Sequence, residues 1–161
     1  MHTSSIKQND KKFQFQWTKN KIIQMITPTC LSMEWVDGPS SEFKSQKKKQ
    51  FYKLDLCWLM LILLGVKTIE IRGKKHEEGV IVGLCANGWT GILWGEAKIH
   101  KVQELTGKDY VSLKNKHRID DERSKYRKPH ALYLSDVKAY TRRWYFTENH
   151  GTQGNPGNMC L

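Results

Sequence analysis

The chain has 161 residues, 39% of them hydrophobic, and a formal net charge of +11. This length favours one domain with an additional segment, and the charge favours an anionic partner, with RNA or DNA before an anionic membrane surface. The four cysteines are too widely spaced for a Cys-x-x-Cys metal knuckle, and Cys57 and Cys85 lie in apolar runs typical of buried thiols in a reducing compartment. We therefore expect no metal site and no cofactor.

The longest apolar run, residues 54–66, is shorter than the roughly 20 residues that a membrane-spanning helix needs. Nothing at the N-terminus resembles a secretory signal. We therefore expect an intracellular protein of the cytoplasm or the nucleus, without a membrane span. Organelle targeting is not excluded, because Asp10 is the one acidic residue before Glu34, although this segment has no arginine.

Composition divides the chain into three parts. Residues 1–50 contain nine lysines and few aliphatic clusters, which predicts a basic, flexible N-terminal extension. Its closing run of lysines, residues 47–49, is compatible with a nuclear-localisation signal, although such runs are usually only solvated. Residues 51–146 have the texture of a folded domain. Residues 147–161 are rich in Gly, Asn and Pro, which predicts a flexible tail.

Within the predicted domain, residues 51–64 are apolar on nearly all sides, which indicates a buried helix that ends at Gly65. Apolar runs predict four strands, at residues 68–72, 80–85, 92–99 and 131–137. The charged segment 101–129 is predicted to be a loop with a short helix near 112–124. Because helices and strands do not alternate regularly, this order predicts an α+β domain or a small β-barrel.

The segment from Gly65 to Arg72 is the most informative of the chain. On the predicted strand, Ile69 and Ile71 point one way and Thr68, Glu70 and Arg72 point the other. The carboxylate and the guanidinium then stand roughly 7 Å apart on one face. This arrangement suits the recognition of a polar ligand, and it equally suits an ion pair that braces the fold.

The apolar helix followed by Gly65, Lys67, Glu70 and Arg72 resembles the Gly-x-Lys-x-x-Glu-x-Arg hallmark of the ASCH domain, a member of the PUA-like superfamily. Residues 79–82, 92–97 and 131–137 resemble later strands of that family. The resemblance implies a PUA-like, partly closed β-barrel of about six strands with flanking helices. It also implies a cleft beside the motif and RNA binding as the general role.

Some relatives in this family resemble enzymes, either amidohydrolases of acylated cytidine or ribonucleases. The amidohydrolase pattern has a lysine followed three residues later by a threonine, but here Glu70 stands three residues after Lys67. The expected function is therefore an RNA-binding module that recognises RNA or a modified nucleoside. The alternative is a nucleotide-directed hydrolase in which Lys67 and Glu70 act as base and acid.

Candidate ligand-binding residues follow from the motif and from two tryptophans that could stack on bases or only pack in the core. They are Lys67, Thr68, Glu70, Arg72, Trp89 and Trp94. Basic residues near aromatic ones suit a surface that follows a nucleic-acid backbone, although a solvated, internally paired loop is an equal alternative. They are Lys114, Lys116, Arg118, Arg123, Lys125, Arg127, Lys128, Arg142 and Arg143. A further alternative is an accessory subunit whose partner is a ribonucleoprotein or another protein.

Overall fold

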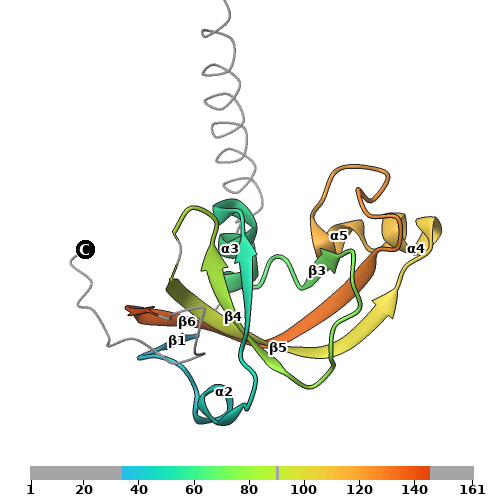
Figure 1. The fold of residues 1–161 in the computed structure, drawn as a ribbon. Coiled ribbons are helices and arrows are strands. Elements are labelled where there is room, and N and C mark those ends of the chain that lie inside the picture. The colour runs from blue at the N-terminus through green and yellow to red at the C-terminus, as the bar shows by residue number, and fades with distance from the viewer. Residues whose placement is uncertain (1–33, 90, 146–161) are drawn as a thin grey trace, which may run out of the picture. The chain divides into compact units, whose positions relative to one another are not determined.

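The structure, a computed structural model, describes residues 34–89 and 91–145. The first half of this part contains β1 Trp35–Val36, α2 Ser41–Ser45, β2 Gln50–Leu54, α3 Leu56–Leu63 and β3 Ile69–Arg72 (Figure 1). The second half contains β4 Ile81–Ala86, β5 Ile92–Glu104, α4 Gly107–Ser112, α5 Lys114–His117 and β6 His130–Tyr145.

Six strands form one mixed sheet in the order β1-β6-β5-β4-β2, and β3 pairs with β6. β1 and β3 lie along the same edge of β6, because β5 occupies the other edge. The long strands β5 and β6 have register shifts that bend them, so the sheet curls without closing. The predicted α+β class with six strands and flanking helices is confirmed, and the described sheet is open.

The core lies between α3 and the curled sheet. Leu59 and Ile62 of α3 are fully buried and belong to one cluster with Val82, Ala97 and Leu132 from β4, β5 and β6. A smaller cluster under α4 joins β3 to the start of β6. In the described part of the chain, no helix is long and apolar enough to cross a membrane.

The helix predicted over residues 51–64 begins later than expected. Residues Gln50–Leu54 form β2, which pairs in parallel with β4. Tyr52 and Leu54 are buried while Lys53 is exposed, which is the alternation of a strand. Asp55 is the N-cap residue, and only then does α3 start. The prediction of one helix was wrong here because an apolar run does not by itself distinguish a buried strand from a buried helix.

The charged region also differs from its prediction. β5 extends to Glu104 and β6 runs from His130 to Tyr145, so both strands are longer than the apolar runs that predicted them. Instead of a helix near 112–124, the two short helices α4 and α5 occupy residues 107–117. Charged residues such as Lys101, Glu104 and Arg143 stand in the added lengths of these strands, because their side chains are exposed while the backbone of β5 pairs with that of β6.

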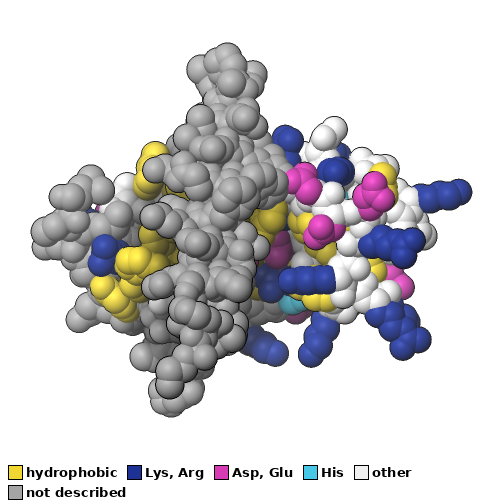
Figure 2. Space-filling model, turned by 90° about the horizontal axis from the view of Figure 1, so that it is seen from above, with side chains coloured by type: hydrophobic (Ala, Val, Ile, Leu, Met, Phe, Trp, Pro, Cys, Tyr) yellow, Lys and Arg dark blue, Asp and Glu magenta, His cyan; other side chains and the backbone are white. Residues whose placement is uncertain are grey.

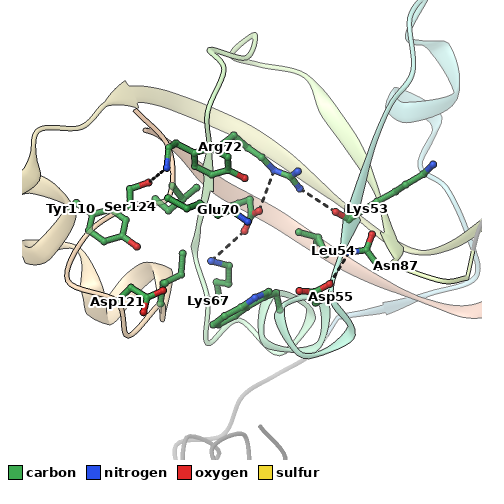
Figure 3. A pocket seen from close by; sticks show the side chains of 15 residues that line it. Lys53, Leu54, Asp55, Lys67, Glu70, Arg72, Asn87, Tyr110, Asp121 and Ser124 are labelled. Atoms are coloured by element: carbon green, nitrogen blue, oxygen red, sulfur yellow. Dashed lines mark hydrogen bonds and ion pairs between the residues drawn. The ribbon is translucent and has the colours of Figure 1, made fainter. Parts of the chain in front are cut away.

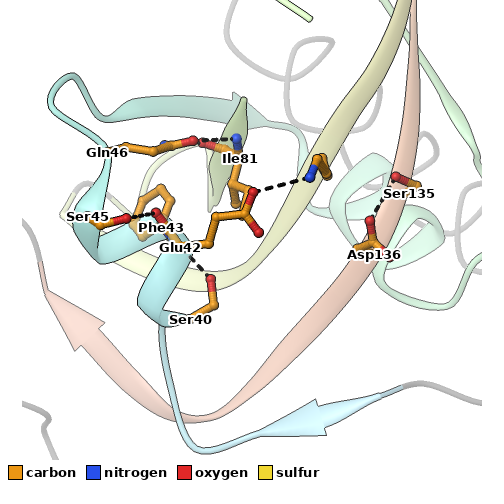
Figure 4. A network of polar contacts seen from close by, with 9 residues as sticks. Ser40, Glu42, Phe43, Ser45, Gln46, Ile81, Ser135 and Asp136 are labelled. Carbon is orange, nitrogen blue, oxygen red and sulfur yellow. Dashed lines mark hydrogen bonds and ion pairs between the residues drawn. The ribbon is translucent and has the colours of Figure 1, made fainter. Parts of the chain in front are cut away.

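Residues 34–50 belong to the folded unit, which corrects the predicted boundary at residue 50. β1 pairs with β6, and Phe43 of α2 is fully buried against the sheet. The Gln46 side chain accepts from the backbone N–H of Ile81 at 2.6 Å and donates to its carbonyl at 2.8 Å (Figure 4). The remainder of the predicted extension, and the predicted tail, lie outside the described residues.

Candidate functional site

A pocket of about 260 Å³ lies between β2, at one edge of the curled sheet, and β3, at the other edge beside β6. Figure 3 shows β3 in the middle, with Asp55 and Asn87 to one side and Tyr110, Asp121 and Ser124 to the other. Its lining comes from six parts of the fold, which are β2, α3 with its cap, the β3 segment, the turn after β4, α4 and the segment after α5. The lining residues are Lys53, Leu54, Asp55, Trp58, Lys67, Glu70, Ile71, Arg72, Asn87, Tyr110, Ile119, Asp121, Ser124, Lys125 and Tyr126.

Three motif residues, Lys67, Glu70 and Arg72, form a charged row of side chains on the floor of this pocket. The Lys67 Nζ lies 3.2 Å from the Glu70 Oε2, and the Arg72 Nε lies 3.1 Å from the Glu70 Oε1. One carboxylate therefore lies between two cations, so the charged row has a net charge of +1. The ion pair of Glu70 and Arg72 that the sequence allowed is present, and Lys67 joins it from the buried side.

Lys67 is the buried member of the charged row, with 1% of its side chain exposed. Its ammonium donates to the carbonyl of His117 at 2.6 Å and lies 5.1 Å from the centre of the Trp58 ring. Burial lowers the pKa of Lys67, while the neighbouring Glu70 carboxylate opposes this change. These contacts make the ammonium a support for Glu70 and for the backbone at His117.

Arg72 is the member of the charged row that reaches solvent, with 25% of its side chain exposed. Its guanidinium lies 4.8 Å from the centre of the Tyr52 ring, and its Nη2 is 3.4 Å from the carbonyl of Lys53. The Nε faces Glu70 without the alignment of a hydrogen bond. Contacts with β2 and β3 therefore hold the plane of the guanidinium while part of its donor edge stays accessible.

His117 anchors the segment that receives the Lys67 ammonium. The imidazole is fully buried and stacks on Tyr110, with ring centres 4.6 Å apart. Its Nδ1 accepts from the backbone N–H of Ile119 at 3.1 Å, so the Nε2, 2.8 Å from the carbonyl of Tyr110, carries the proton and donates. The ring is thus neutral, and burial lowers its pKa.

The His117 environment predicts a pH-dependent stability. Because the pKa is lowered on folding, the unfolded chain binds more protons below the ordinary histidine value of about 6.5. The free energy of unfolding should therefore be fully retained above this pH and fall as the solution is acidified through it. Urea unfolding between neutral and mildly acidic pH measures this decline, and His117→Gln should flatten it.

His76, whose pKa burial also lowers, contributes in the same direction, so His76→Gln should remove a separate share of the slope. His100 is exposed and provides the matched control. An unchanged slope in His117→Gln would contradict the assignment of a buried neutral imidazole.

The walls of the pocket combine aromatic rings with polar groups. Trp58, Tyr110 and Tyr126 contribute rings, and the Asn87 side chain donates to Asp55 at 2.7 Å. The lining holds four cations, Lys53, Lys67, Arg72 and Lys125, and three anions, Asp55, Glu70 and Asp121, a net charge of +1. Rings with both donors and acceptors suit a flat, polar, aromatic ligand better than a bare anion.

The structure separates the predicted ligand-binding residues into two groups. Lys67, Glu70 and Arg72 line the pocket together. Thr68 is exposed and is not part of the pocket lining; its backbone N–H donates to Lys116. Trp89 and Trp94 also stand outside the lining, where they pack edge to face with ring centres 6.1 Å apart.

The predicted basic residues are likewise divided. Figure 2 shows Lys and Arg side chains around the rim of the half of the domain that carries α4 and α5. Lys125 lines the pocket, while Lys114 and Arg123 line a neighbouring cavity that shares Tyr110 and Asp121 with it. Lys116, Arg127 and Lys128 are exposed in the same region.

Three of the predicted basic residues stand apart from this rim. Arg118 is half-buried and donates to the carbonyl of Val66. Arg142 pairs with Asp37 at 2.8 Å, near the far end of β6, and the neighbouring Arg143 is exposed there. Arg142 and Arg143 therefore belong to a second basic cluster, as the sequence predicted, apart from the one near α4 and α5.

Several lining residues carried no sequence signal of their own. Trp58 reads as one apolar residue in a buried helix, and Asp55 and Asn87 as a cap and a turn. Tyr110 and Tyr126 are aromatic residues in a charged segment that carries no motif. Among the described residues, no group of three or more His, Cys, Asp or Glu side chains is placed to hold a metal ion.

Comparison with known proteins supports the fold. No family model and no curated protein matches the chain significantly. Among solved structures, ASCH from Zymomonas mobilis is similar, with a TM-score of 0.51 and 16% identity over 58% of this chain and 71% of that one. A mutant form of the same protein has a TM-score of 0.48 at 15% identity, over 58% of this chain and 73% of that one. The described part of the chain thus has an ASCH-domain fold, as the motif predicted.

Proposed function

We propose that this chain binds RNA and that its pocket receives one base or modified nucleoside. The observation that carries the proposal is the charged row of Lys67, Glu70 and Arg72 on the floor of a pocket with aromatic walls. Its three members divide the work. Lys67 and Glu70 are buried and orient the guanidinium, and Arg72 offers it to the ligand.

The chemistry of Arg72 supports this role. A guanidinium presents a rigid fork of donors that matches a phosphate or the acceptor edge of a base. Here Glu70 and the Tyr52 ring restrict the orientation of the fork, so little conformational freedom is lost on binding. The overall charge of +11 adds attraction for a polyanion that does not depend on sequence.

The size of the pocket supports a small unit as its occupant. Its volume of about 260 Å³ is below the roughly 300–1,000 Å³ typical of sites for drug-sized ligands. The rings of Trp58 and Tyr126, both partly exposed in the lining, offer faces on which a base can stack, while the Tyr110 ring is buried against His117. A single nucleoside unit, turned out of a strand, fits this scale better than a duplex.

A hydrolase is the second candidate function, and one observation favours it. Burial lowers the pKa of Lys67, which brings the neutral amine needed for a general base within closer reach of physiological pH. However, the ammonium already contacts His117, Glu70 and Trp58, and almost none of it is exposed. Binding is therefore the better-supported function.

Arg72→Met should weaken the binding of a short random-sequence RNA about 10-fold, since a two-point contact contributes roughly 1–3 kcal/mol. Arg72→Lys should recover part of the loss, because it restores the charge without the planar fork. Fluorescence anisotropy at low salt measures the affinity, which should fall further as salt is added.

Lys47→Met is the matched control, since it removes the same charge from an exposed position outside the pocket. Circular dichroism establishes that each variant is folded. Undetectable RNA binding at low salt, or equal affinities for Arg72→Met and the unaltered chain, would sink the proposal. Turnover of an acylated nucleoside that Lys67→Ala abolishes would favour the hydrolase instead.

A further inference from the structure

We infer that Trp89 forms a second stacking position beside the pocket, so that the preferred ligand is a strand of linked nucleotides rather than a free nucleoside. The inference rests on the proposed function, and it assigns a role to an exposed ring that the pocket does not use. Trp89 is 47% exposed, so part of its ring is accessible to a ligand.

The turn that carries Trp89 is attached to one end of the pocket. Asn87 lines the pocket, and its backbone N–H donates to the carbonyl of Leu54 at 2.7 Å. Its side chain donates to Asp55, directly before α3. Trp89 follows two residues later, so its Cα lies within roughly 7 Å of that of Asn87. The Trp89 backbone is therefore adjacent to the side of the pocket where Figure 3 shows Asp55 and Asn87.

The Trp89 ring is also held in place. The Trp89 backbone N–H donates to the carbonyl of Ala86 at 3.1 Å, and Gly88 has the positive φ of 82° that this tight turn requires. The ring packs edge to face with Trp94, which is partly buried against the core cluster beneath α3. A stationary ring with an exposed side is suited to stacking, because binding does not need to immobilise it.

The size of the pocket then determines where a neighbouring nucleotide lies. The pocket holds about one nucleoside, so the next base of the same strand must lie outside it. Outside and beside it, the Asn87 turn presents Trp89, and Leu56, 41% exposed, stands next to Asp55. Base–aromatic stacking is sequence-tolerant and suits a single strand.

The test compares a mononucleotide with a strand. The probes are an equimolar mixture of the four nucleoside 5′-monophosphates and a short random-sequence RNA, each titrated by calorimetry or anisotropy at low salt. Trp89→Ala should weaken binding of the RNA by about 5- to 100-fold, and this loss should exceed that for the mononucleotides. Trp89→Phe should keep most of the affinity, because it retains a ring.

Trp35→Ala is the matched control. Trp35 is 59% exposed on β1, which pairs with β6 at Ala139 and Tyr140, away from the pocket. If Trp35→Ala weakens RNA binding as much as Trp89→Ala, the effect is nonspecific and the inference is wrong. It is also wrong if Trp89→Ala instead turns a dimer into a monomer in sedimentation, since the ring would then be an interface between copies.

The two failures are distinguishable. RNA binding that depends on Arg72 but is unaffected by Trp89→Ala overturns only the second stacking position. RNA binding that is absent, or that does not depend on Arg72, overturns the proposed function and with it the inference.

Discussion

Replacing Lys67 with methionine is expected to lower the free energy of unfolding by about 3 kcal/mol, at the lower end of the cost of breaking a buried ion pair. The substitution leaves the carbonyl of His117 without its donor and Glu70 with Arg72 as its remaining cation. Urea unfolding monitored by tryptophan fluorescence measures the loss. The same variant should also bind RNA less tightly, since Glu70 no longer orients Arg72 firmly.

A double-mutant cycle with Glu70→Gln separates the pair from its surroundings. If Lys67 and Glu70 interact as the 3.2 Å contact indicates, the two losses should not add, with a coupling of about 1 kcal/mol or more. Lys116→Met, at an exposed position on α5, is the control and should change stability by about 0.5 kcal/mol or less. Additive losses would show that Lys67 acts through His117 and Trp58 and not through Glu70.

Phe43→Ala is expected to destabilise the domain by about 3–5 kcal/mol, as truncation of a fully buried aromatic side chain does. Phe43 contacts a core cluster that includes Ile81, Leu93 and Tyr140, and its ring meets that of Phe51 edge to face at 6.1 Å. Thermal unfolding followed by circular dichroism measures the effect. The expected result is large because α2 covers one end of the sheet.

Two controls accompany this variant. Phe43→Leu should cost less, since it keeps much of the buried volume, and Ser45→Ala, on the exposed side of α2, should have little effect. If Phe43→Ala costs only about 0.5 kcal/mol, the typical effect of a surface substitution, residues 34–50 would be the loosely attached extension that their composition predicts.

The charged row of Lys67, Glu70 and Arg72 gives a physical reason why one motif would serve both stability and ligand binding. A guanidinium that stands alone on a sheet edge would sample many orientations. Glu70 restricts it, and Lys67 holds the Glu70 carboxylate in place from the buried side. The same contacts stabilise the fold, so stability and binding measurements on Lys67 and Arg72 should diverge: Lys67 affects both, while Arg72 affects mainly binding.

Local patterns predicted much of the fold. The strand at Ile69–Arg72 follows from alternation, and the buried face of Leu93, Gly95, Ala97 and Ile99 follows from the same rule. The apolar helix ends just before Gly65, as the glycine predicted, and Gly65 adopts the positive φ of 71° that glycine tolerates. β2 was missed because its alternation is hidden in a longer apolar run, and α2 because one buried phenylalanine among lysines gives a weak periodicity.

The sequence by itself determined the ASCH-like motif, the α+β class and the positive charge, because these depend on residue identity and on spacing within one element. Only the tertiary structure decided which residues surround the motif. Trp58, Tyr110, Tyr126 and Asn87 meet at the pocket because the curled sheet brings β2 and β3 opposite one another. It also decided that Lys67 is buried while Arg72 reaches solvent. Both side chains belong to the same motif, but burial depends on the packing of α3 and α5, which no local spacing encodes.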